Sequence, residues 1–142
     1  MDKELLSELW SVAHEVADAA RKVTLKHFRS KGLSAESKKQ DFDPVTIADR
    51  DAEQAMRDIL LRRRPLDGIL GEEHASVEST TGLTWVLDPI DGTRGYISGT
   101  PTWGVLIALS NYEGPILGIV DQPYIGERFC GCLLYTSDAA DD

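Results

Sequence analysis

The amino-acid sequence predicts one domain of layered α+β structure, in which helices come first and a sheet follows. Two long amphipathic stretches occupy residues 1–29 and 46–64, in the first half of the chain. Short apolar runs separated by turn residues fill the stretch from residue 67 to residue 131. Because no linker or internal repeat divides these segments, we expect the helices to pack on a sheet within a single α/β domain.

The first element is predicted to be a helix over residues 1–29. Its apolar residues recur at a spacing close to 3.6, and Gly32 follows basic residues that suit a helix C-terminus. The polar, turn-rich segment 33–46 is expected to form a short hairpin or a loop. Asp43-Pro44 within it favours an extended backbone before the next helix.

The second helix is predicted to begin at Thr46 and to end before Pro65. Thr46 and Asp49 have the spacing of a capping box, in which an acid three residues after the N-cap hydroxyl reaches back to the backbone. The run from Arg62 to Arg64 falls in the last turn, where positive charge suits the helix dipole. We expect these arginines to lie on a solvated face.

Five strands are predicted in the second half of the chain. They cover residues 68–71, 83–87, 102–110 and 114–121, with a fifth that starts after Pro123 within residues 122–131. The third and fourth runs are separated only by a turn at residues 111–113, which predicts an antiparallel hairpin.

The composition excludes several classes of protein. The formal net charge of −9 argues against non-specific nucleic-acid binding, which needs a basic face. No apolar run approaches the roughly 18 residues of a membrane span, and the charged N-terminus does not resemble a secretory signal. Cys130 and Cys132 are too close in sequence to staple a fold. We therefore expect a cytoplasmic protein with neither nucleic-acid nor membrane partners.

The segment from Cys132 to Asp142 differs in character from the rest of the chain. Its sequence, CLLYTSDAADD, resembles the conceptual translation of a sequencing-library adapter. We therefore predict a truncated domain over residues 1–131, followed by a non-native tail over residues 132–142. A natural C-terminus without fixed structure is the alternative interpretation.

Acidic residues follow two of the predicted strands. Glu72 and Glu73 come directly after the run GILG, and Asp88 and Asp91 come after the run LTWVL. If these strands are neighbours in one sheet, the four carboxylates meet at one edge, where they repel one another unless a divalent cation lies among them. Ligands that are all oxygen suit Mg²⁺. The alternative interpretation is an ordinary polar turn after a buried strand, since Asp, Pro, Gly and Thr are all common in turns.

The residues between and after these carboxylates suit an anionic ligand. The Ile90 carbonyl is expected to lie outside the strand ladder and so to be free for ligation. Gly92 permits a backbone conformation that a side chain would forbid, and it lets the backbone approach a ligand closely. Gly92, Thr93 and Arg94 offer successive N–H groups at a predicted helix start. Carboxylates that can bind a metal ion thus lie beside N–H groups that can bind an anion. This combination predicts hydrolysis of a phosphate monoester by metal-activated water.

These motifs, together with the segment from Asp43 to Asp49, resemble the inositol monophosphatase superfamily of Mg²⁺-dependent and Li⁺-sensitive phosphatases. The resemblance extends along essentially all of residues 1–131. It implies the N-terminal half of an αβαβα sandwich, two or three Mg²⁺ ions as cofactors and a small phosphorylated alcohol as substrate. It also implies a homodimer for the full-length protein.

The resemblance implies a role for each matching acid. Glu72 would bind the first metal ion and help to activate the attacking water. Asp88 would bridge two metal ions, the Ile90 carbonyl would complete the first site, and Asp91 would hold the second ion. Glu73 would support these ligands without binding metal itself.

The same resemblance implies the catalytic and substrate contacts. Thr93, paired with Asp43, would orient the attacking water, so that these two residues and Glu72 form the catalytic set. The backbone and side chains after Asp91 would cradle the phosphate of the substrate. The expected substrate contacts are Asp91, Gly92, Thr93 and Arg94.

Departures from the common inositol phosphatase pattern indicate a narrower branch. Arg94-Gly95-Tyr96 follows the Asp-Gly-Thr motif, and together with residues 97–104 and 120–129 it resembles the bacterial histidinol-phosphatase branch. We therefore expect histidinol phosphate, an intermediate of histidine biosynthesis, as the substrate. Inositol 1-phosphate and nucleotide 3′-phosphates are the alternatives.

One motif of the superfamily is missing from the chain. A Trp-Asp-x-Ala motif in the second half of these enzymes carries the aspartate that completes the second metal site, and no such motif occurs here. We therefore expect the chain to be inactive on its own. A phosphate- or metal-binding module without catalysis is the second functional hypothesis.

Overall fold

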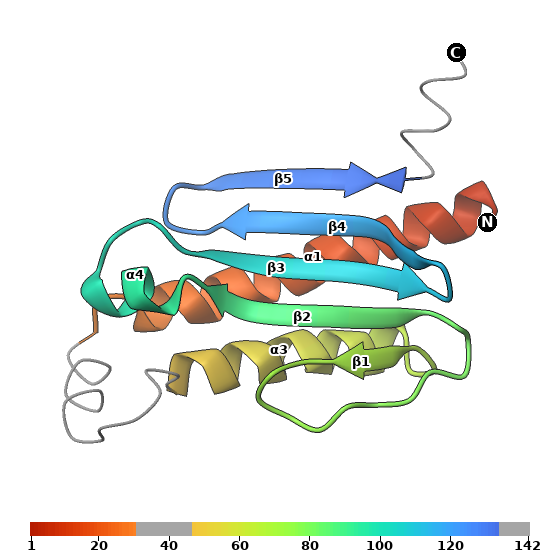
Figure 1. Ribbon diagram of the computed structural model, residues 1–142, viewed down its shortest axis with the longest axis horizontal. Helices are drawn as coiled ribbons and strands as arrows, with labels where there is room; N and C mark the ends of the chain where they lie inside the picture. The colour runs from red at the N-terminus through yellow and green to blue at the C-terminus, as the bar shows by residue number, and fades with distance from the viewer. Residues whose placement is uncertain (31–46, 134–142) are drawn as a thin grey trace, which may run out of the picture.

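A computed structural model describes residues 1–30 and 47–133 and contains two main layers, a pair of helices and a mixed sheet (Figure 1). The helices are α1 (Lys3–His27), α3 (Ile47–Arg63) and the short α4 (Thr93–Ser98). The strands are β1 (Gly68–Leu70), β2 (Thr84–Asp91), β3 (Gly104–Asn111), β4 (Gly114–Gln122) and β5 (Glu127–Cys132). The predicted layered α/β fold, with helices before strands, is confirmed.

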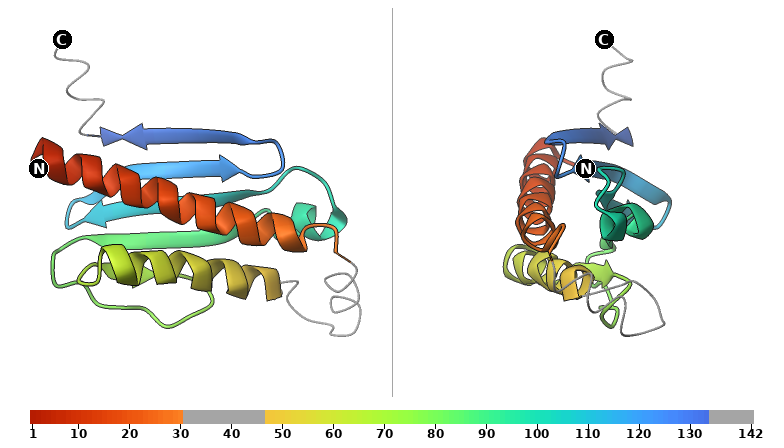
Figure 2. Two further views of the ribbon diagram at one scale, coloured as in Figure 1. Left: turned by 180° about the vertical axis from the view of Figure 1, so that it is seen from behind. Right: turned by 90° about the vertical axis from the view of Figure 1, so that its left-hand side faces the viewer.

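The helices α1 and α3 lie side by side on one face of the sheet (Figure 2). Asp2 caps α1 by accepting a hydrogen bond of 2.7 Å from the backbone N–H of Leu5. The buried face of α1 carries small and branched apolar residues, namely Leu9, Val12, Ala13, Val16, Ala17 and Ala20. Trp85 of β2 and Val105 and Leu109 of β3 are fully buried in the same core cluster. Among the described residues, no helix is both long and apolar enough to cross a bilayer.

The strands are ordered β1-β2-β3-β4-β5 across the sheet. β1 and β2 are parallel, and the remaining neighbours are antiparallel, which confirms the hairpin predicted for β3 and β4. The parallel pair places the C-terminal ends of β1 and β2 at the same edge of the sheet.

β2 is longer than the sequence predicts. The expected strand ends at Leu87, but pairing with β3 continues through Asp88 and resumes at Asp91. The register shifts between these two aspartates, where Pro89 lacks a backbone N–H for the ladder. The strand therefore carries an irregularity at this point and does not end there.

β5 begins later than the sequence predicts, at Glu127 and not directly after Pro123. Gln122 is the last residue of β4, and the Gly126 N–H donates to its carbonyl at 2.8 Å to close a turn. Gly126 has a φ of +83°, a conformation that favours glycine. The turn takes up the residues that the prediction assigns to the start of the strand.

The predicted domain boundary at residue 131 falls inside β5. Cys132, the last residue of this strand, is buried in the core and pairs with Leu117 of β4. Residues 134–142, most of the predicted non-native tail, lie outside the described residues. The boundary therefore stays a prediction.

The sequence predicts that the arginines at the end of α3 lie on a solvated face, but in the structure they form ion pairs with other elements. Arg62 and Arg63 both pair with Glu15 of α1, with an Nη1–Oε1 distance of 2.7 Å for Arg63. Arg64 pairs with Asp67, just before β1, at 2.8 Å. These ion pairs fasten the C-terminal end of α3 to α1 and to the start of β1.

A buried ion network fastens α1 to the last two strands. Asp121 of β4 is fully buried, and its Oδ1 atom lies 2.6 Å from Arg21 Nη2 of α1 and 2.8 Å from Arg128 Nε of β5. Arg128 also pairs with Asp18 of α1 at 2.7 Å. The network joins the first helix to strands about 100 positions further along the chain.

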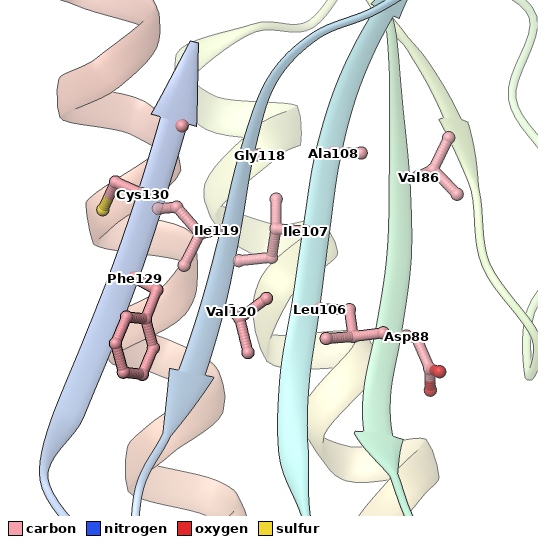
Figure 3. A pocket seen from close by; sticks show the side chains of 11 residues that line it. Val86, Asp88, Leu106, Ile107, Ala108, Gly118, Ile119, Val120, Phe129 and Cys130 are labelled. Carbon is pink, nitrogen blue, oxygen red and sulfur yellow. The ribbon is translucent and has the colours of Figure 1, made fainter.

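The other face of the sheet is covered by neither α1 nor α3, and it carries a hollow of about 540 Å³ (Figure 3). A row of cross-strand neighbours crosses this face. Asp88 of β2 lies opposite Leu106, Leu106 lies opposite Val120, and Val120 lies opposite Phe129. Val120 and Phe129 are exposed. Within the described residues, this face is therefore an apolar surface that no helix covers, with one acid, Asp88, at its end.

Candidate metal and phosphate site

The acids that follow two strands in the sequence meet at one edge of the sheet. Glu72 and Glu73 come just after β1, and Asp88 and Asp91 lie at the end of β2. Because β1 and β2 are parallel neighbours, both pairs of acids stand at the C-terminal ends of these strands. The two strands are therefore neighbours in one sheet, which is the arrangement that brings the four carboxylates to one edge.

Asp49, in the first turn of α3, adds a buried carboxylate to this edge. It is 1% exposed, and within the described residues its Oδ1 atom has no hydrogen-bond partner. Burial, and after it the negative charges of Glu73, Asp88 and Glu72, raise the pKa of Asp49 to about 8. A buried carboxylate oxygen without a partner beside other acids suits a cation or a hydrogen-bond donor.

The acids at the strand ends also act on one another. Burial raises the pKa of Asp88 to about 6, with further contributions from the charges of Glu72 and Asp91, while a hydrogen bond to the Ile90 backbone opposes the rise. In the part of the chain that the structure describes, no lysine or arginine forms an ion pair with Glu72, Asp88 or Asp91. These three carboxylates therefore repel one another without a described cation between them.

The donor set suits Mg²⁺, which binds carboxylate and carbonyl oxygens. Glu73 differs from the other acids, because one of its oxygens lies 3.9 Å from Arg50 Nε. Within residues 1–30 and 47–133, no three His, Cys, Asp or Glu side chains are arranged to hold a metal ion as they stand. The described side chains thus include oxygen ligands suited to Mg²⁺, but they do not form a complete coordination site as they stand.

A small apolar cluster joins the end of β2, the start of α3 and α4. Ile90 is buried and packs with Ala48, Tyr96 and Trp103. The rings of Tyr96 and Trp103 meet edge to face with their centroids 4.8 Å apart, and the Tyr96 hydroxyl donates to the Thr24 carbonyl at 2.8 Å. This packing fixes the backbone that carries the aspartates of β2.

Gly92 makes the turn between β2 and α4. Its φ is +85°, and a Cβ atom added there would lie 2.7 Å from the Thr102 carbonyl oxygen. Only glycine fits this position without strain. α4 begins at Thr93, which confirms the predicted helix start and places Thr93 and Arg94 in its first turn, close to Asp91.

Asp43 lies outside the described residues, so its pairing with Thr93 stays a prediction. The metal-binding roles of Glu72, Asp88, Ile90 and Asp91 and the substrate contacts also stay predictions.

The sequence analysis missed three buried charged residues of α3 that bear on this site. Asp49 is interpreted there as a capping residue and as part of the segment that resembles the superfamily, without a role of its own in the site, and Glu53 and Arg57 are passed over. A signal was present, because these residues recur at a spacing of four beside the apolar series Ala48, Ala52, Met56 and Leu60. A search for periodicity among apolar residues alone does not detect charged residues on a buried face.

The chain is similar to known proteins in sequence and in fold. Residues 5–136 match the model of the inositol monophosphatase family. The chain is 44% identical over 128 residues to the chloroplastic bifunctional phosphatase IMPL2 of Arabidopsis thaliana, covering 89% of this chain and 36% of that protein. It is 42% identical over 118 residues to a histidinol-phosphatase of Chlorobaculum parvum, covering 83% of this chain and 45% of that protein.

The fold is also that of solved members of the family. An inositol monophosphatase from Zymomonas mobilis superposes with a TM-score of 0.70 at 40% identity, covering 93% of this chain and 49% of that one. The chain thus spans less than half the length of each of these three proteins. Both the sequence and the fold match members of the family along almost all of the chain. This chain therefore belongs to the inositol monophosphatase family.

Proposed function

We propose that the full-length protein containing this chain is a Mg²⁺-dependent phosphatase for a small phosphate monoester, with histidinol phosphate as the favoured substrate. One observation carries the proposal. Glu72, Asp88 and Asp91 stand at one edge of the sheet, Asp88 has a raised pKa, and no described cation neutralises them. Such a group of acids is stabilised by divalent cations.

In this proposal Glu72, Asp88, Asp91 and the Ile90 carbonyl would hold Mg²⁺. Two bound ions would supply Lewis acidity to the phosphate and would acidify the attacking water. Asp49 adds a buried carboxylate to the same edge, where its Oδ1 atom has no described partner. The chain's own contribution is to bring these oxygens together in the turn after β1, at the end of β2 and on the first turn of α3.

The residues after β2 would bind the substrate. Thr93, with Asp43, would orient the attacking water, and the backbone of Gly92 and Thr93 would approach the phosphate. Arg94 is exposed in the first turn of α4, where its guanidinium is accessible to an anion. Asp91 would serve both as a metal ligand and as a substrate contact.

Two observations favour histidinol phosphate. Arg94-Gly95-Tyr96 departs from the pattern common in inositol phosphatases, and the Chlorobaculum parvum relative, a histidinol-phosphatase, is 42% identical. Inositol 1-phosphate is the second candidate, because the Zymomonas mobilis inositol monophosphatase is 40% identical and covers 93% of the chain.

Substrate profiling of the full-length protein tests the proposal. With Mg²⁺ present, kcat/KM for histidinol phosphate should exceed that for inositol 1-phosphate by about tenfold or more, a difference of about 1.4 kcal/mol in transition-state stabilisation. EDTA should remove both activities. A higher kcat/KM for inositol 1-phosphate would reverse the substrate assignment. A protein that hydrolyses no monoester with Mg²⁺ would favour a phosphate- or metal-binding module without catalysis.

A further inference from the structure

We propose that the buried ion pair of Glu53 and Arg57 is a positioning device for Glu72. The pair holds the turn of residues 72–75, and with it the Glu72 carboxylate, at the sheet edge that carries Asp88. This inference rests on the proposed function, in which Glu72 binds a metal ion. Glu53 and Arg57 themselves act through the backbone of the turn.

Glu53 binds three successive backbone N–H groups of this turn. Its Oε1 atom accepts from the N–H groups of Glu72 at 2.9 Å and Glu73 at 3.1 Å, and its Oε2 atom accepts from His74 at 3.0 Å. The Glu53 side chain is fully buried. Hydrogen bonds to a charged acceptor are stronger than neutral ones, so three of them fix the course of the chain where β1 ends.

Arg57 binds the other side of the same turn. Its Nε atom donates to Glu53 Oε2 at 3.0 Å, and its Nη1 and Nη2 atoms donate to the carbonyls of Ala75 at 2.7 Å and His74 at 3.1 Å. Arg57 is 6% exposed. One member of the pair thus holds the N–H groups of the turn, and the other member holds its carbonyl groups.

The turn lies directly on the Glu53 carboxylate. A Cβ atom added at Gly71 would lie 2.4 Å from Glu53 Cδ. The residue before Glu72 is therefore in close contact with α3, and the chain cannot shift toward the helix. Gly71 is needed here because a side chain would collide with Glu53. Its backbone conformation does not itself require glycine, since its φ is not in the left-handed region.

Glu72 depends on this backbone anchor for its position. Its side chain is exposed, and no lysine or arginine among the described residues pairs with it. An exposed glutamate samples several rotamers, and holding it in one of them costs side-chain entropy. A fixed backbone reduces the space that the carboxylate can sample before any ligand binds.

The placement of the pair favours a role in the site over a role in stability alone. The desolvation of two buried charges offsets much of their attraction, and apolar replacements of such pairs are often as stable. Asp49 lies one helical turn before Glu53 on the same helix. α3 therefore positions two acids of the cluster, one through its own side chain and one through the turn that it holds.

Glu53→Gln in the full-length protein is the first test. The amide keeps the size of the side chain and one oxygen, but its NH₂ group cannot accept from both His74 and Arg57 as the Oε2 atom does. We expect the Mg²⁺ concentration for half-maximal phosphatase activity to rise about 10- to 100-fold, as for other residues that orient metal ligands. Mn²⁺ binding without substrate, followed by electron paramagnetic resonance, should weaken by a similar factor.

Asp67→Asn is the matched control. Asp67 is also a buried carboxylate paired with an arginine, Arg64, and it accepts further hydrogen bonds from Thr81 and Trp85. It precedes β1, at the opposite end of this strand from Glu72. We expect both Asp67→Asn and Glu53→Gln to lower Tm, but we expect Asp67→Asn to keep the wild-type Mg²⁺ requirement and Mn²⁺ affinity.

The outcomes separate the positioning role from a purely structural one. Wild-type Mg²⁺ dependence and Mn²⁺ affinity in Glu53→Gln would overturn the inference. If Glu53→Gln does not fold, Arg57→Lys decides, because one ammonium group cannot span Glu53, His74 and Ala75 together. Wild-type Mn²⁺ affinity in folded Arg57→Lys would then overturn the inference. A wild-type protein that neither needs Mg²⁺ nor binds Mn²⁺ would overturn the proposed function itself.

Discussion

Replacing Asp49 with asparagine should stabilise the metal-free protein at neutral pH. Asp49 is buried near Glu73, Asp88 and Glu72, and its pKa is raised from 3.8 to about 8. Between these two pH values the folded state keeps a proton that the unfolded chain has released. The free energy of unfolding therefore falls as the pH rises through this window. Asparagine does not ionise, so the variant escapes this loss.

The magnitude follows from the size of the pKa shift. One pKa unit corresponds to about 1.4 kcal/mol, so ionisation of the unfolded chain lowers the stability of the wild type by about 4 kcal/mol between pH 3.8 and pH 7. Relaxation of the structure and entry of water around the acid reduce this value. We expect Asp49→Asn to raise the free energy of unfolding by about 2–4 kcal/mol at pH 7 and by little at pH 4.

Urea denaturation in EDTA at pH 4 and at pH 7 measures this difference. The control is Asp58→Asn, an exposed aspartate of the same helix bonded to Gln54, which should change stability by less than about 0.5 kcal/mol. Added Mg²⁺ should shrink the advantage of Asp49→Asn, because a nearby cation stabilises the ionised wild-type acid. If Asp49→Asn is no more stable than the wild type at pH 7 in EDTA, burial and the neighbouring acids do not raise the pKa of Asp49 in the folded protein.

Three further changes have defined outcomes. Asp91→Asn in the full-length protein should lower kcat by about 100-fold with little change in Tm, because Asp91 is exposed; an active variant would remove it from the metal ligands. Gly92→Ala should lower Tm more than Gly126→Ala, since both have positive φ but only a Cβ at Gly92 meets other atoms; calorimetry showing equal losses would contradict this. This chain produced on its own should bind a hydrophobic dye and self-associate through the sheet face that carries the exposed Val120 and Phe129, and the double substitution Val120→Lys and Phe129→Lys should reduce both effects. A monomer without dye binding would refute that expectation.

The parts of the fold that local physics determines could be predicted from the sequence. The side-chain periodicity of α1, the turn between β3 and β4 and the helix start after Gly92 depend on residues within a few positions of one another. The placement of Glu72 and Asp88 at the same edge of the sheet could also be predicted, because acids that follow neighbouring parallel strands share one edge.

Features that depend on distant residues could not be predicted. Arg63 pairs with Glu15 across 48 positions, and nothing near either residue in the sequence marks its partner. An acid at position 49 suits a capping box, whereas its burial beside the acids of β1 and β2 is a tertiary effect. The continuation of β2 past Leu87 likewise depends on its pairing with β3.

The ion network that joins α1 to β4 and β5 bears on the order in which the domain folds. The strands from β2 to β5 pair in sequence order and close short loops, whereas Arg21 and Asp121 are 100 positions apart. Closing a longer loop costs more entropy, and non-local contacts slow folding. We expect the hairpins to assemble first, so Val16→Ala in α1 should mainly speed unfolding and leave the refolding rate little changed. We therefore expect the N-terminal helix, which leaves the ribosome before the strands, to dock only after they have paired.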